Sequence, residues 1–189
     1  MMRIITGSAR GTHLYTLSGE ATRPTSERTK EALFSILQQA PLNARVLDLF
    51  AGSGQLGLEA LSRGAASAVF VDASKEAADV VRRNAEKTHL QDRATVVISD
   101  ALSYLRSCRE APFDLVFLDP PYAANLLPQC LRLLTEKKLL TPSATIVTES
   151  ASPADVFSGD TTLPAQFEIQ KQNRYGIAHL TVLSLAVKE

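Results

Sequence analysis

The run Phe113-Asp114-Leu115-Val116-Phe117-Leu118-Asp119-Pro120-Pro121-Tyr122 joins an apolar stretch to an acid, two prolines and an aromatic residue. The apolar part predicts a buried β-strand. Two consecutive prolines cannot continue a sheet ladder, because neither has an N–H group to donate. We therefore expect the strand to stop at Asp119. The next residues would form a rigid turn at its carboxyl end, the edge where open α/β sheets bind ligands.

Asp119–Tyr122, called the DPPY segment below, gathers three kinds of recognition group within four residues. The Asp119 carboxylate and the Pro120 carbonyl can accept hydrogen bonds from an amino group, and the Tyr122 ring can stack on the flat ring that carries it. Asp119, Pro120 and Tyr122 are therefore our candidate catalytic residues. The simpler alternative is a surface turn that follows a strand.

On both sides of this segment, apolar strand-like runs alternate with helical stretches. Such alternation predicts right-handed βαβ units and a parallel sheet covered by helices on both faces. The last two runs, residues 167–172 and 177–187, are joined by only four residues, which predicts an antiparallel hairpin. The expected fold class is thus α/β, with a mainly parallel seven-stranded sheet that ends in this hairpin. The other expected strands are residues 46–50, 68–72, 94–98, 113–118 and 144–148, with helices at 55–63, 74–89, 101–109 and 125–137 between them.

The first residues precede this pattern. Residues 3–6 and 12–17 alternate in polarity around a loop at 8–11, which predicts a small β-ribbon. A helix should follow, with Thr25 as its N-cap and Pro41 as its end. We expect a single globular unit made of a ribbon appendage (residues 1–22) and a main domain (residues 23–189).

A glycine-rich loop follows the first strand of the main domain, in the run Asp48-Leu49-Phe50-Ala51-Gly52-Ser53-Gly54. With Gly57 it satisfies the dinucleotide pattern G-x-G-x-x-G, and Asp72 ends the next strand where an acid that binds ribose belongs. These features fit NAD and S-adenosylmethionine equally well. Asp48 favours the second, because an acid beside the loop suits a cationic ligand and repels a pyrophosphate.

Composition narrows the classes of partner. The chain has 20 basic and 20 acidic residues, so its overall charge predicts no partner, but residues 1–30 hold five basic and two acidic residues. A basic end indicates a polyanion as the partner, with a solvated charged surface as the alternative.

The two cysteines and three histidines form no metal-binding or disulfide pattern, and we expect reduced thiols and no metal. No run approaches membrane-spanning length, so we expect a cytoplasmic protein without a membrane partner.

Four blocks of this sequence resemble the RsmD family, bacterial 16S ribosomal RNA guanine-N2 methyltransferases with a Rossmann-like class I fold. The blocks are Arg23–Phe34, Asp48–Ala65, Asp119–Tyr122 and Arg174–Gly176. The resemblance implies S-adenosylmethionine as cofactor. Aspartate at position 72 is a departure, since glutamate is common there in the family. The implied cofactor contacts are Asp48 near the amino-acid end, Gly52 and Gly54 through their backbone, Asp72 at the ribose, Asp100 and Ala101 at the adenine, and also Phe50.

The resemblance also implies a partner and a substrate. In the family the target is a guanine in a hairpin loop of 16S rRNA, modified on the small ribosomal subunit, and we expect a monomeric enzyme. DNA adenine-N6 methylation, methylation of a small-molecule or protein amine, an NAD-binding protein and an inactive RNA-binding module are the alternatives. The residues expected to contact RNA phosphates are Arg3, Arg10, Arg23, Arg28, Lys30, Lys171 and Arg174.

Overall fold

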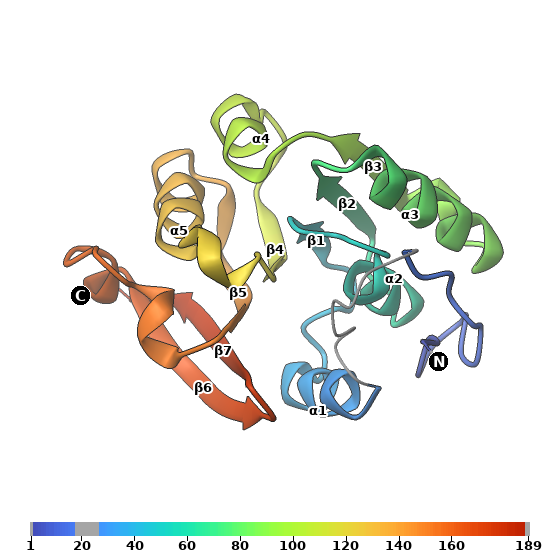
Figure 1. Cartoon of the computed structure of the whole chain (residues 1–189), viewed down its shortest axis with the longest axis horizontal. Coiled ribbons are helices and arrows are strands. Elements are labelled where there is room, and N and C mark those ends of the chain that lie inside the picture. Colours follow the sequence, from blue (N-terminus) through green and yellow to red (C-terminus); the bar gives the residue numbers. More distant parts are fainter. Residues whose placement is uncertain (1, 18–26, 188–189) are drawn as a thin grey trace.

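The computed structural model describes residues 2–17 and 27–187, which form one seven-stranded sheet between two layers of helices (Figure 1). The strand order is β3-β2-β1-β4-β5-β7-β6. The first five strands run parallel, and β7 is antiparallel to both β5 and β6. The predicted fold class is therefore confirmed. The strands are β1 (Arg45–Asp48), β2 (Ser67–Asp72), β3 (Ala94–Ile98), β4 (Phe113–Leu118), β5 (Leu140–Ser150), β6 (Phe167–Tyr175) and β7 (Ala178–Leu185).

Helices cover both faces of the sheet. Figure 1 shows α1, α2 and α3 on one face and α4 and α5 on the other. Each layer encloses its own apolar core, because the central strands β1 and β4 are buried on both sides. The α-helices are α1 (Glu27–Leu37), α2 (Gln55–Ser62), α3 (Lys75–Lys87), α4 (Ala101–Ser107) and α5 (Leu127–Glu136); the short 3₁₀ helices are η1 (Gln91–Arg93), η2 (Tyr122–Ala124), η3 (Pro153–Val156) and η4 (Leu163–Ala165).

Two strands are longer than the sequence predicts. The β5 strand starts at Leu140, because Leu140 pairs with Phe113 before a register shift that accommodates Pro142. The β6 strand continues to Tyr175, whose partner is Ala178. The hairpin therefore turns over Gly176 and Ile177 alone, and the expected four-residue connection is wrong. Gly176 has a φ of 65°, a backbone conformation that glycine adopts without strain.

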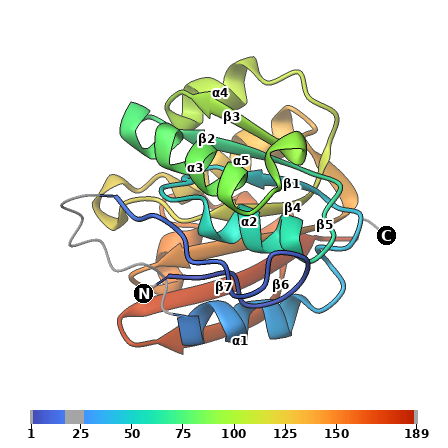
Figure 2. The ribbon, with the colours of Figure 1, turned by 90° about the vertical axis from the view of Figure 1, so that its right-hand side faces the viewer.

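The N-terminal segment, residues 2–17, does not form the expected ribbon. Its two runs form no regular strands: they pair through one isolated antiparallel bridge between Arg3 and His13, and the N–H of Gly11 also donates to the carbonyl oxygen of Ile4. Its apolar side chains instead join the core beneath α1 and α2, and Figure 2 shows the segment running between these helices. Its backbone is held by three side chains of the main domain: Glu59, Ser62 and Asn84.

Lys30 lies inside the protein, so the prediction that it contacts RNA is wrong. Its side chain is fully buried, donates to the carbonyl oxygen of Arg3 at 2.6 Å, and lies 3.6 Å from the carboxylate of Glu59. Burial lowers the pKa of Lys30, and Glu59 opposes that shift. Glu59 also accepts from the backbone N–H groups of Ile5 and Thr6 and from Arg63. Lys30 is therefore part of the ionic group that anchors the N-terminal segment.

Among the helices of residues 2–17 and 27–187, none combines the length and the apolar character needed to cross a bilayer.

Candidate active site

Five parallel strands end in acids along one edge of the sheet. In spatial order these are Asp100 after β3, Asp72 on β2, Asp48 on β1, Asp119 after β4 and Glu149 on β5. All five line one large cleft, together with the glycine-rich loop and the DPPY segment. The carboxyl edge of the sheet is thus strongly acidic, which suits a cationic ligand or a set of hydrogen-bond donors.

Asp72 fixes the shape of the glycine-rich loop. One of its carboxylate oxygens accepts from the N–H of Gly52 at 2.9 Å, and the other accepts from the N–H of Ser74 at 2.9 Å. Gly52 has a φ of 52°, which an L-residue adopts only with strain. Since each carboxylate oxygen has further acceptor capacity, Asp72 can hold the loop and still bind a hydroxyl group in the cleft.

Asp48 supplies the missing cap of α2. The N-cap position, Gly54, has no side chain, and Asp48 accepts from the N–H of Gly57 at 3.0 Å instead. A Cβ atom at Gly57 would lie 2.3 Å from the Phe70 ring, so only glycine allows this helix to pack so closely on β2. Burial, partly offset by the Gly57 N–H, raises the pKa of Asp48 to about 7, and neighbouring Asp72 adds to the rise.

The unfolding free energy of the Asp48→Asn variant should change less with pH than that of the wild type. The raised pKa means that the folded protein binds a proton at Asp48 that the unfolded chain has released, so stability falls as pH rises from about 4 towards 7. Because of this carboxyl, the unfolding free energy of the wild type should be lower at pH 8 than at pH 5 by about 2–3 kcal/mol. Asparagine keeps an acceptor for Gly57 and cannot ionise. Urea unfolding at both pH values measures the difference, with exposed Asp92→Asn as the control; an unchanged pH slope in Asp48→Asn would contradict the assignment.

Asp100 and Gln55 both line the cleft. Asp100 is the N-cap of α4, and its bonds with Ser103 lower the pKa of its carboxyl. Its neighbour Ala101 begins the helix and lines the cleft. Gln55 also lines the cleft, and its buried Oε1 has no hydrogen-bond partner among residues 2–17 and 27–187. A buried acceptor without a partner is costly, so Gln55 indicates a ligand that donates a hydrogen bond here.

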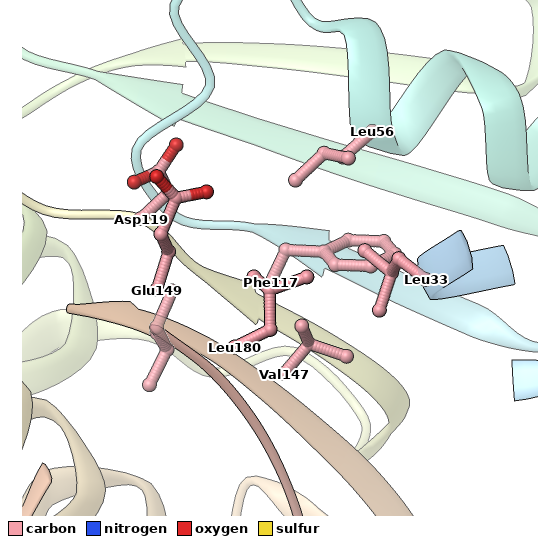
Figure 3. A pocket seen from close by; sticks show the side chains of 8 residues that line it. Leu33, Leu56, Phe117, Asp119, Val147, Glu149 and Leu180 are labelled. Atoms are coloured by element: carbon pink, nitrogen blue, oxygen red, sulfur yellow. The ribbon is translucent and has the colours of Figure 1, made fainter. Parts of the chain in front are cut away.

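The DPPY segment places Asp119 beside Glu149. Figure 3 shows the two carboxyl groups close together at one end of a small cavity, with apolar side chains around the rest. Burial raises the pKa of Asp119 well above its usual range, and the charges of Glu149 and then Asp48 add to the rise. The Tyr122 hydroxyl donates to Glu149 at 2.8 Å, while 40% of Tyr122 remains exposed. The segment thus presents a half-buried carboxyl acceptor next to an open aromatic face.

The β6–β7 turn also lines the cleft. Arg174, Tyr175, Gly176 and Ile177 line it, and Ile177 is 55% exposed. Arg28 at the start of α1 lies on the same cleft. The cleft is therefore lined by two arginines, Arg28 and Arg174, as well as by the acids at the strand ends.

Most of the predicted site residues meet in this one cleft. Gly54 is not one of the residues that line the cleft. A Cβ atom at this position would point at the side chains of Val81 and Phe70. Arg3 is partly exposed and paired with Glu27 at 3.3 Å, and Arg10 and Lys171 are exposed elsewhere on the surface. Arg23 and Thr25 lie outside the described residues. The predicted residues that line the cleft are Arg28, Asp48, Phe50, Gly52, Asp72, Asp100, Ala101, Asp119, Pro120, Tyr122 and Arg174.

Two residues of the cleft were missed by the sequence interpretation, Glu149 and Gln55. Glu149 carries the same signal as Asp72 and Asp100, an acid directly after an apolar strand run, and that signal was not applied to the fifth strand. Gln55 gives no such signal, because its unpaired oxygen is visible only in three dimensions.

The groups of the cleft fit S-adenosylmethionine, which carries positive charge, ribose hydroxyls and an adenine amine. Carboxylates suit the charge and the hydroxyls, and the unpaired oxygen of Gln55 can accept from a donor of such a ligand. Within residues 2–17 and 27–187, no three His, Cys, Asp or Glu side chains are grouped so as to hold a metal ion.

Known proteins share this arrangement over nearly the whole chain. Residues 2–184 match the model of a family described as Conserved hypothetical protein 95. Ribosomal RNA small subunit methyltransferase D of Haemophilus influenzae is 36% identical over 93% of this chain and 90% of its own. The Escherichia coli K12 protein of the same name is 37% identical over 93% and 85%. The solved structure of Escherichia coli yhhF, a candidate methyltransferase, superposes with a TM-score of 0.86 at 34% identity and covers 99% of both chains.

Proposed function

The chain belongs to the RsmD family of small-subunit ribosomal RNA methyltransferases, and from this we propose that it methylates the exocyclic N2 amine of a guanine in 16S rRNA. The observation that carries the proposal is the DPPY segment at the carboxyl end of β4, inside a cleft lined by strand-end acids. This arrangement supports transfer of a group to a flat amine. The ribosomal substrate is supported by the relatives named above.

We propose that S-adenosylmethionine occupies the half of the cleft between β1 and β3. Asp72 would bind the ribose hydroxyls, Asp100 and Ala101 the adenine, and Asp48 and Gly52 would lie near the amino-acid end. When bound, this cofactor supplies an electrophilic methyl group on a sulfonium sulfur. The ordered glycine loop, held by Asp72, gives the cofactor a preformed site.

The DPPY segment would position the amine. An exocyclic amine is a weak nucleophile because its lone pair is delocalised into the ring. Asp119 and the Pro120 carbonyl would accept from its two hydrogens and aim the lone pair at the methyl group, and Tyr122 would stack on the base. Such positioning can lower a barrier by about 7–11 kcal/mol at best. As the N–C bond forms, the bond between the methyl carbon and the sulfonium sulfur would break and leave a neutral thioether. The nitrogen then loses one proton, which Asp119 or water would accept.

RNA contacts would come from the cleft and the adjoining surface. Arg28 and Arg174 line the cleft and suit phosphates that flank the target base. Arg3, Arg10 and Lys171, on the exposed surface, and Arg23, outside the described residues, complete the proposed set. Phosphate contacts give affinity and orientation but no sequence information. All groups of the proposed site belong to one chain, so we propose that the enzyme acts as a monomer. We also propose that it works in the cytoplasm, where ribosomes assemble.

The function is tested by mapping the methylated base. Purified protein is incubated with labelled S-adenosylmethionine and unmodified small subunits, naked 16S rRNA or DNA, and the modified nucleoside is identified. We expect N2-methylguanine in 16S rRNA. N6-methyladenine in DNA would support the alternative enzyme class, and absence of labelled product in every substrate would contradict a methyltransferase. Calorimetry with S-adenosylmethionine and NADH in parallel should show binding of the first and not of the second.

A further inference from the structure

We propose that Glu149 identifies the target base as guanine by accepting a hydrogen bond from the ring N1–H group, beside the amine held by Asp119. The inference rests on the proposed function. It assigns base specificity to β5, a strand that lies outside the DPPY segment. Glu149 would thus be a specificity-determining residue that touches the substrate.

The register of the sheet places the two carboxyl groups side by side. Leu118 on β4 pairs in parallel with Thr148 on β5, so Asp119 and Glu149 are the next residues on neighbouring strands. Neighbouring strands lie about 4.8 Å apart. Residues at equal register in a parallel pair point to the same face, and Phe117 and Val147, two positions earlier, line the same small cavity. Figure 3 shows the two carboxyl groups together at its polar end.

Tyr122 ties Glu149 to the expected stacking surface. Its hydroxyl donates to Glu149 at 2.8 Å, so the aromatic ring and this carboxylate are held in a fixed relation. A carboxylate has about four acceptor sites, so Glu149 can keep this bond and accept another. A base stacked on Tyr122 with its amine at Asp119 would therefore have its neighbouring ring position next to Glu149.

Guanine matches a pair of acceptors better than any other base that carries an amine. Its N2 amine lies beside the N1–H group, so two donors face the same direction. The amine of adenine is flanked by N1 and that of cytosine by N3, and both of these nitrogens are acceptors. A carboxylate that faces the lone pair of adenine N1 or cytosine N3 is repelled and keeps no hydrogen-bond partner. A site with such a carboxylate therefore binds these two bases less well than guanine. The Asp119 and Pro120 acceptors alone would accept any of the three amines.

The surroundings strengthen this discrimination. Leu33, Leu56 and Leu180 line the same small cavity, and the two half-buried carboxyl groups lie together at its polar end. Burial and the charge of Glu149 raise the pKa of Asp119, as expected where two carboxyl groups share one site. The two adjacent donors of guanine would relieve this repulsion.

The test compares RNA hairpins that carry either guanine or 2-aminopurine at the target position. 2-Aminopurine keeps the 2-amine but has a lone pair at N1 in place of N1–H. Binding is measured by fluorescence anisotropy in the presence of S-adenosylhomocysteine, and quenching of 2-aminopurine reports stacking on Tyr122. The variants are Glu149→Gln, whose amide can donate to N1 or accept from N1–H, and Tyr122→Phe, which removes only the tie between ring and carboxylate. Exposed Glu136→Gln is the matched control.

We expect the wild type and Glu136→Gln to prefer guanine by about 10-fold or more, as for one well-placed base contact. Glu149→Gln should reduce this preference by about 10-fold, whereas Tyr122→Phe should weaken both hairpins equally. Since 2-aminopurine also lacks O6, the deciding result is the change between wild type and Glu149→Gln. An unchanged preference in that variant, or no preference in the wild type, would overturn the assignment.

The outcome is separable from the proposed function. If wild-type protein methylates guanine in small subunits while Glu149→Gln keeps its preference for guanine, only the role of Glu149 is wrong. If Glu149→Gln and Tyr122→Phe behave alike, Glu149 serves to hold the tyrosine and does not contact the base. If wild-type protein forms no N2-methylguanine, the proposed function itself fails.

Discussion

An Asp119→Ala variant should lose methyl transfer by about 100-fold or more in kcat while it binds S-adenosylmethionine almost normally. Asp119 lies at the end of β4, and its carboxyl group is held in a partly buried position where it can accept from the target amine. Without it, the Pro120 carbonyl remains as an acceptor, but the amine is free to rotate away from the methyl group. The proposed cofactor contacts of Asp72, Asp100 and Ala101 are untouched, so donor affinity should persist.

Single-turnover kinetics on small subunits and donor calorimetry measure the two effects separately. The control is Asp92→Ala, an exposed acid in the η1 turn. Because burial raises the pKa of Asp119, the ionised carboxyl opposes folding, so loss of its charge should not destabilise the fold. A variant with near-normal turnover would show that the DPPY segment does not position the substrate.

A Glu59→Ala variant should lose about 3–5 kcal/mol of unfolding free energy, the usual cost of breaking a buried ion pair. Glu59 is fully buried and accepts from two backbone N–H groups, Ile5 and Thr6, and from Arg63, with the Lys30 ammonium 3.6 Å away. Its removal leaves the buried Lys30 charge without its carboxylate. A domain of this size is stable by roughly 5–15 kcal/mol, so the loss would be a large part of the total.

Urea unfolding of Glu59→Ala and of Glu31→Ala, an exposed glutamate on the same helix as Lys30, tests this expectation. The double variant Lys30→Met with Glu59→Leu should recover part of the loss, because no buried charge remains. Recovery should be incomplete, since the N–H groups of Ile5 and Thr6 still lack their acceptor. A Glu59→Ala variant as stable as Glu31→Ala would show that the ionic group contributes nothing to folding.

The sheet and most of the candidate site could be predicted from the sequence because their signals are local. Apolar runs, the glycine-rich loop and the acids that follow strands lie within short windows, and the rule that parallel strands share a carboxyl edge brings them together. The N-cap roles of Ser74 and Asp100 are equally local. For these features the chain neighbours of a residue largely determine its environment.

The errors come from residues whose environment is set by distant partners. Lys30 has the sequence context of an exposed base near a helix start, yet Glu59, 29 positions later, draws it into the core. The alternation of residues 3–6 and 12–17 is genuine, but side chains of α2 and α3 take the backbone hydrogen bonds that a ribbon would have used. Glu149 carries the local signal of an acid after an apolar strand, but its position beside Asp119 follows only from the pairing of β4 with β5.

The anchoring of the N-terminal segment has a consequence for the order in which the protein is made. Tyr15 is synthesised early, but Asn84, which bonds to both its N–H and its carbonyl oxygen, follows 69 positions later. At about 5–20 residues per second, roughly 3–14 seconds of translation separate the two. The apolar side chains of Met2, Ile4 and Leu14 therefore emerge from the ribosome well before the helices that bury them, and they cannot reach their native place until α2 and α3 have been translated.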